Sequence, residues 1–188
     1  MVWAATESNG LVSPTDPAQS TTMPQRIAQR KNAINAQLTT ARQQRLVKQC
    51  AVAQTGIQQI KIKDTAAANT RRETYTKLAT RLSTIIDRLE RQSINTTALK
   101  TAQDAFTRAI NQYLKNAISY KTAMDDIVIM DCAKDPLGFE ATLLSTRQLR
   151  ARLSSDTARV KTAVPLLTQE LDKAKQELIE KENDGGGE

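Results

Sequence analysis

Apolar residues recur at every third or fourth position over most of the chain, from about residue 71 to residue 178. The most regular stretch runs from Phe106 to Ile127, where the steps alternate between four and three residues. This spacing places one apolar stripe along an α-helix and is the rhythm of coiled coils. The pattern therefore predicts an all-α fold, an elongated antiparallel coiled-coil bundle of three helices.

Turn and cap signals divide the chain into segments. Residues 1–23 are rich in Ser, Thr, Pro, Gly and Ala and show no regular spacing of apolar residues. We expect a flexible leader there. The helical bundle is predicted over residues 24–182, followed by a disordered tail at 183–188. The three helices are expected at about 24–92, 96–130 and 136–181.

Caps and breaks within the bundle are also predicted. The first helix is either continuous or two collinear helices, with the break nearest Gly56, where the apolar frame changes. Asn95 suits the cap of the second helix. Asp135 and Pro136 suit the start of the third, and Pro165 is expected to kink it. The predicted core positions are Tyr75, Leu78, Leu82, Ile85 and Leu89 in the first helix; Leu99, Ala102, Phe106, Ile110, Tyr113, Ala117, Tyr120, Met124 and Ile127 in the second; and Phe139, Leu143, Leu149, Leu153, Thr157, Val160, Val164, Leu167, Leu171, Ala174 and Leu178 in the third.

The two cysteines, Cys50 and Cys132, have two interpretations. They form a disulfide that ties the first helix to the end of the second, or they are two small buried thiols. A hairpin centred near Asn95 leaves them about eight residues, or about 12 Å, out of register. An extended exit from the second helix and a break at Gly56 would together close that gap.

Charge is unevenly distributed in a chain whose net charge is +7. Residues 25–93 hold 14 basic and 4 acidic residues, and no acid occurs between Asp16 and Asp64. One interpretation is a basic helix that binds a polyanion such as nucleic acid or an anionic cell-wall polymer. The other is an ordinary solvated helix surface. The candidate contacts are Arg26, Arg30, Lys31, Arg42, Arg45, Lys48, Lys61 and Lys63.

Helix lengths identify a segment without an obvious partner. The second and third predicted helices cover the first back to about Cys50, which leaves residues 25–50 without a full intrachain partner. Ile27, Ile34 and Leu38 form an apolar stripe on this segment. We therefore expect residues 25–50 to mediate self-association or docking of another protein.

Composition argues against an enzyme. The chain has no histidine, the commonest general base and metal ligand, and no convergent group of carboxylates or lysines stands out. Two cysteines without histidine are too few ligands for a metal site, so no cofactor is predicted. No stretch reaches the roughly 18 apolar residues that a transmembrane helix needs. The small residues around Trp3 are compatible with the remnant of a removed signal or with an ordinary N-terminus.

Two stretches carry a resemblance: Arg81–Lys100, reading RLSTIIDRLERQSINTTALK, and Asp131–Phe139, reading DCAKDPLGF. Together with an upstream cysteine they resemble uncharacterised, predicted exported coiled-coil proteins of small-genome candidate-phylum bacteria, over roughly residues 46–175. The resemblance implies an exported, cell-envelope setting and a paired Cys50 and Cys132. It implies no substrate or cofactor. The expected function is that of a non-enzymatic structural, spacer or assembly protein of the cell envelope, with polyanion binding as the alternative.

Overall fold

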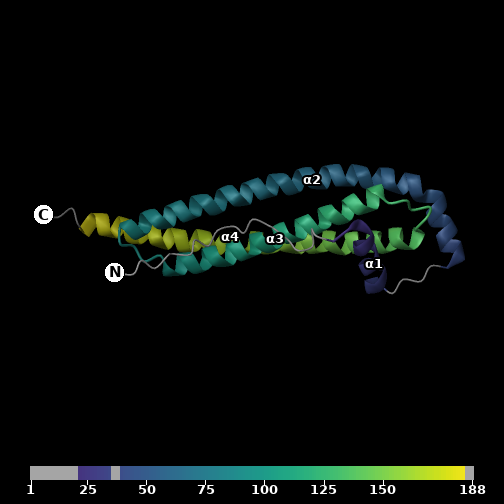
Figure 1. Ribbon diagram of the computed structural model, residues 1–188. Coiled ribbons are helices and arrows are strands. Elements are labelled where there is room, and N and C mark those ends of the chain that lie inside the picture. The colour runs from purple at the N-terminus through teal and green to yellow at the C-terminus, as the bar shows by residue number, and fades with distance from the viewer. Residues whose placement is uncertain (1–20, 35–38, 185–188) are drawn as a thin grey trace. The chain divides into compact units, whose positions relative to one another are not determined.

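The computed structural model describes residues 21–34 and 39–184 of the 188 in the chain. This part contains four α-helices and no strand (Figure 1). The helices are α1 (Met23–Ile34), α2 (Thr40–Arg91), α3 (Thr97–Ile129) and α4 (Pro136–Asp184). The all-α prediction is therefore confirmed, whereas the first predicted helix is two separate helices.

The break between α1 and α2 lies upstream of the predicted one. α2 passes through Gly56 without interruption, so the predicted break there is wrong. A mid-helix glycine costs only about 1 kcal/mol, and burial of the adjacent Ile57 favours the helix. α2 begins after Thr39, whose hydroxyl accepts a hydrogen bond from the Arg42 N–H at 3.4 Å. A threonine cap of this kind stabilises a helix start.

The ends of the later helices match the predictions closely. α4 begins at Pro136, where the Asp135 carboxylate accepts the Gly138 N–H at 2.9 Å, as the predicted cap requires. α4 continues through Pro165, and the kink expected there stays a prediction. The helix also includes Asn183 and Asp184, which were expected in the tail. The leader at 1–20 and the tail at 185–188 lie outside the described residues.

The chain divides into two compact units, each built from segments that are distant in sequence. The turn unit contains Glu73–Gln112 and the described part of α4 from Asp156 onward. The corner unit contains α1, α2 up to Arg72, and Tyr113–Ser155. Thus α2, α3 and α4 each contribute a segment to both units.

The turn unit contains the α2–α3 connection. Ser93 has a φ of 56°, and the Ser93 and Ile94 N–H groups donate to the carbonyls of Glu90 and Leu89. These two bonds form a Schellman motif, which closes a helix C-terminus with one left-handed residue. Ile94 and Leu89 are both buried, which supplies the apolar contact that accompanies the motif.

The start of α3 differs by one residue from the predicted cap. The Asn95 side chain accepts the Thr97 N–H at 3.1 Å, as expected of a capping asparagine. The Thr96 carbonyl accepts the first helical bond, from Lys100, so Thr96 occupies the cap position. Its hydroxyl donates to Glu90 at 2.7 Å. Hydrogen bonds from Lys100 and Thr96 lower the pKa of the Glu90 carboxyl.

The α2 stripe in the turn unit is shifted by one residue at two positions. Leu82 and Leu89 are buried as predicted, but Leu78 is 40% exposed and Ile85 is 36% exposed. Ala79 and Ile86 are buried in their place. The predictions for α3 hold more completely, since Leu99, Ala102, Phe106, Ile110, Tyr113, Tyr120, Met124 and Ile127 are all buried. In α4, Phe139, Val160, Leu167 and Ala174 are buried, whereas Val164 is 39% exposed.

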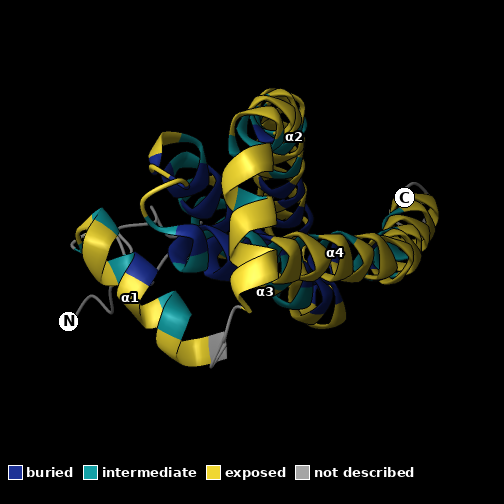
Figure 2. Ribbon diagram, turned by 90° about the vertical axis from the view of Figure 1, so that its right-hand side faces the viewer, coloured by how far each residue is buried: buried dark blue, intermediate teal, exposed yellow. Residues whose placement is uncertain are grey.

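The corner unit has its own apolar core, which includes a residue of α1. Ile27 is the one buried residue among the described side chains of α1, and exposed and intermediate residues make up the rest (Figure 2). The cluster that contains Ile27 consists of Ile27, Ile57, Tyr120, Met124, Ile127, Met130, Cys132 and Phe139. Ile27 therefore has an intrachain partner, contrary to the prediction for residues 25–50. The Ile34 side chain and Leu38 lie outside the described residues.

Within residues 21–34 and 39–184, no helix is both long enough and apolar enough to cross a membrane.

Candidate functional site

The predicted cysteine pair meets in the corner unit. Cys50 on α2 and Cys132 in the α3–α4 connection lie at disulfide distance, with their Cα atoms 5.9 Å apart. That separation lies within the range that a disulfide requires. Cys132 is fully buried. The pair thus joins α2 to the connection between α3 and α4.

The register between α2 and α3 explains why no break at Gly56 is needed. A hairpin centred on Asn95 would place Asp64 opposite Asp126. Instead, the Tyr120 hydroxyl donates to Asp64 at 2.5 Å, six residues away from that position. This displacement accounts for most of the eight-residue mismatch that the sequence suggested for the cysteines.

Gln54 holds the C-terminal end of α3 beside the cysteine pair. Its side-chain amide donates to the carbonyl oxygens of Ile127, Val128 and Met130, at 3.1, 3.3 and 2.7 Å. Helix C-termini leave carbonyl groups without intrahelical partners. Gln54 satisfies such groups from a neighbouring helix and fixes where α3 ends against α2.

Two of the predicted polyanion contacts form a buried ion-pair cluster. Arg26 donates to both carboxylate oxygens of Asp126, at 2.6 and 3.0 Å. Arg30 donates to the same carboxylate at 2.7 Å. The Asp126 side chain is 1% exposed, against 20% for Arg26 and 13% for Arg30. The hydrogen bond to Asp126 raises the pKa of the Arg26 guanidinium. This cluster attaches α1 to α3.

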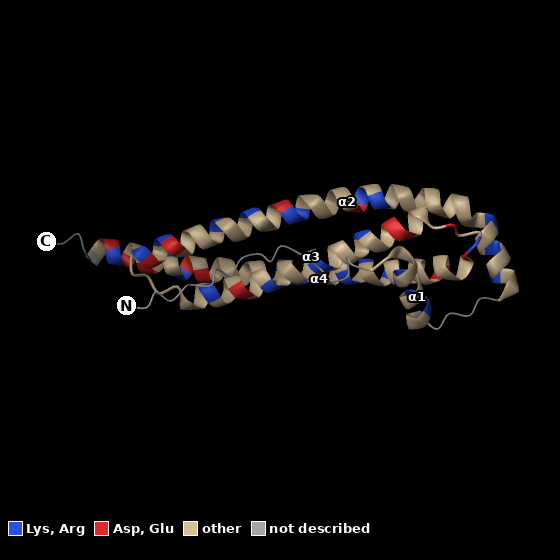
Figure 3. Cartoon of the chain, in the orientation of Figure 1, with Lys and Arg blue, Asp and Glu red and all other residues tan. Residues whose placement is uncertain are grey.

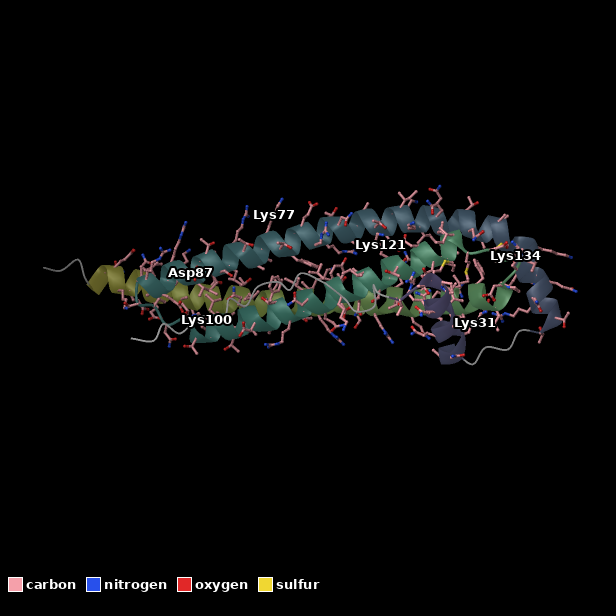
Figure 4. The ribbon with its side chains drawn as sticks, in the orientation of Figure 1. Lys31, Lys77, Asp87, Lys100, Lys121 and Lys134 are labelled. Carbon is pink, nitrogen blue, oxygen red and sulfur yellow. A yellow bond between two sulfur atoms is a disulfide. The ribbon has the colours of Figure 1, made fainter. Side chains whose placement is uncertain are left out.

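Three more predicted contacts also pair within the corner unit. Lys31, labelled in Figure 4, lies 2.8 Å from the Asp135 carboxylate. Arg42 pairs with the buried Glu140 on α4. Lys61 lies 2.7 Å from Asp125 on α3. Five of the eight predicted cations thus bind the protein's own carboxylates.

Asp125 is shared between two helices. Burial alone would raise the pKa of its carboxyl, but hydrogen bonds from Lys121 and Lys61 outweigh burial and lower it. Asp125 is therefore held as a carboxylate that joins α2 to α3.

The other three predicted cations remain on the surface. Arg45, Lys48 and Lys63 are exposed on α2, along which Lys and Arg recur (Figure 3). None of them has an ion-pair partner within residues 21–34 and 39–184. These three side chains are the candidate polyanion contacts that do not pair with a carboxylate within the described residues.

The sequence did not single out Asp126, Glu140, Gln54 or Gly138. A Cβ at Gly138 would lie 2.9 Å from the Ile27 Cγ2 atom and closer still to Asp135, so glycine allows α1 to approach α4. One available signal was the spacing of Arg26 and Arg30, which places two cations on one face of α1. The single carboxylate that both bind, Asp126, lies about 100 residues further along the chain.

The described residues contain no group of three potential metal ligands. Comparisons with known proteins gave no matching family model, no matching curated protein and no matching solved structure.

Proposed function

We propose that this chain is a non-enzymatic structural or assembly protein, exported to the cell envelope, whose helices form an elongated antiparallel coiled-coil bundle. The observation that carries the proposal is the use of charge in the corner unit. Five of the eight candidate polyanion contacts pair with carboxylates of α3, of α4 or of the connection between them. These ion pairs join the helices of the corner unit, as expected of a structural role.

Export is supported by the cysteine pair. Structural disulfides persist in oxidising compartments and are rare where thiols are kept reduced. The separation of Cys50 and Cys132 is compatible with such a bond. The resemblance of the Asp131–Phe139 segment to predicted exported proteins points the same way.

The proposed assembly surface is the exposed side of the first two turns of α2. Thr40, Gln43, Gln44, Val47 and Lys48 line a shallow groove there. Their spacing of three and four residues places them on one helix face. Val47 is 39% exposed, and the groove is lined by α2 alone. A helix from a second copy of the chain fits such a face, because four of its five side chains are uncharged and side chains at this spacing pack against a partner helix.

The test is solution mass as a function of protein concentration, measured by analytical ultracentrifugation. We expect the wild type to associate and Val47→Glu to stay monomeric at concentrations where the wild type does not. Val52→Glu is the matched control, because Val52 lies on α2, is 78% exposed and is absent from the groove. A wild type that is monomeric at all concentrations would refute the assembly role, as would equal effects of the two variants.

Polyanion binding is the second candidate, and Arg45, Lys48 and Lys63 are the exposed, unpaired cations of the described segment that favour it. Retention on heparin at increasing salt tests it, because charge-driven binding weakens steeply with salt. The variant with all three changed to Gln should then elute at clearly lower salt. A control with Lys115, Arg147 and Arg152 changed to Gln removes the same charge from other exposed positions of the corner unit. Equal shifts in the two variants would exclude a specific site on α2.

A further inference from the structure

A small hollow lies between α2 and α3 in the corner unit, away from the cysteine pair and the assembly surface. Its volume is about 180 Å³. Ala68 from α2 and Leu114, Ala117 and Ile118 from α3 supply its apolar lining. The hollow exists because two facing positions are alanine, where larger residues would fill the space between the helices.

The geometry of this hollow is fixed by a polar bridge at one end. Asp64 on α2 accepts the Tyr120 hydroxyl of α3 at 2.5 Å. Arg150 on α4 donates to one oxygen of the same carboxylate at 3.3 Å and forms an ion pair with the other at 3.1 Å. Burial, followed by the hydrogen bond to Asp64, raises the pKa of the Tyr120 hydroxyl, so it stays protonated as the donor. Three helices are thereby tied together beside the hollow.

The charged groups of the lining favour an anion. Arg72 and Lys121 both line the hollow, and Lys121 is labelled in Figure 4. Arg72 is exposed and has no ion-pair partner within the described ranges, whereas Lys121 also pairs with Asp125. The only carboxylate among the lining residues is Asp64, whose charge Arg150 already offsets. The lining therefore combines an apolar surface with an uncompensated positive charge.

The size of the hollow selects the ligand class. The volume of about 180 Å³ lies below the roughly 300–1,000 Å³ of pockets that hold drug-sized ligands. That is too small for a helix but suitable for a short aliphatic chain. We propose that the hollow binds a short-chain aliphatic carboxylate, with its chain against Ala68 and Ala117 and its carboxylate beside Arg72.

The test titrates octanoate into the full-length protein and follows binding by calorimetry and by backbone amide chemical shifts. We expect saturable binding, with the largest shifts at residues 64–72 and 114–121. Octan-1-ol serves as the uncharged probe of the same length and should bind more weakly. Shifts spread over the whole chain, or heat that does not saturate, would overturn the proposal.

Matched variants separate the hollow from general surface binding. Ala117→Leu fills the hollow and should weaken octanoate binding about tenfold or more. Ala66→Leu makes the same change at an exposed position of α2 outside the lining and should bind like the wild type. Arg72→Gln should weaken octanoate by up to about fivefold, the range of an exposed ion pair, and leave octan-1-ol unchanged.

In a second variant, Ala68→Met, the longer side chain fills the hollow from α2. This variant provides the test if Ala117→Leu disturbs folding. Helix content and thermal midpoint from circular dichroism identify which variants are folded. A folded filling variant that binds octanoate as tightly as the wild type would place the ligand elsewhere. Equal affinities for octanoate and octan-1-ol would show that Arg72 does not bind the ligand carboxylate. The outcome does not depend on whether the chain assembles, so the two proposals succeed or fail separately.

Discussion

Reduction of the Cys50–Cys132 pair should destabilise the protein by an amount that its loop length predicts. The two cysteines are 82 residues apart in sequence. In the chain-entropy model, closing a loop of that size in the unfolded chain stabilises the native state by about 4.5 kcal/mol. Because the separation of the Cα atoms already suits a disulfide, little of this should be offset by distortion of the helices.

Urea unfolding followed by circular dichroism, with and without a thiol reductant, measures this difference. The comparison changes only the bond, whereas substitution of Cys132 also alters a fully buried side chain. The control is the double variant Cys50→Ala/Cys132→Ala, whose midpoint should not respond to reductant. The slope with urea should rise on reduction, because the unfolded chain without a cross-link exposes more surface.

Two results would refute this reasoning. Alkylation of both thiols without reductant, seen by mass, would show that the bond does not form. An oxidised protein whose unfolding midpoint is insensitive to reductant would show that the bond forms but adds nothing. The first would also remove the main structural support for an oxidising compartment.

Three further changes test individual contacts, each by urea unfolding. Ser93→Gly should stabilise the protein by about 1 kcal/mol, because it relieves the cost of a left-handed residue with a side chain; a loss of stability would contradict this. Gly138→Ala should destabilise by about 1–3 kcal/mol, since the added Cβ crowds Ile27 and the α4 cap; no change would mean that α1 is not held there. Asp126→Asn should cost up to about 3–5 kcal/mol, less what water recovers at the two partly exposed arginines, by leaving Arg26 and Arg30 unpaired; substitution of both arginines as well should recover part of the loss.

The α3 seam was predictable from sequence because most of its large apolar residues lie on one face. In α2 either of two adjacent apolar stripes could face the core. Leu78 and Ile85, on one stripe, are larger and more apolar than Ala79, on the other. The structure nevertheless buries Ala79, because a small residue allows neighbouring helices to approach closely. Only the position of the neighbouring helices decides between the two stripes, and a single sequence does not contain that information.

The ion-pair partners of the basic segment were not predictable for a different reason. A segment without acidic residues offers its own cations no ion-pair partner within that segment. Arg26 and Arg42 find carboxylates 100 and 98 residues away, on α3 and α4. Charge balance is set by which helices lie together, so a local excess in sequence does not establish an exposed basic surface.

The corner unit also accounts for α1 itself. A helix of 12 residues is marginal in water, so α1 depends on what it contacts. It buries Ile27 in the cluster that contains Cys132 and Phe139, and it places Arg26 and Arg30 on Asp126. These groups belong to the end of α3 and the start of α4, which the Cys50–Cys132 pair and Gln54 hold against α2. The docking of α1 should therefore weaken when the disulfide is reduced, because its binding site is assembled by the bond rather than by α1.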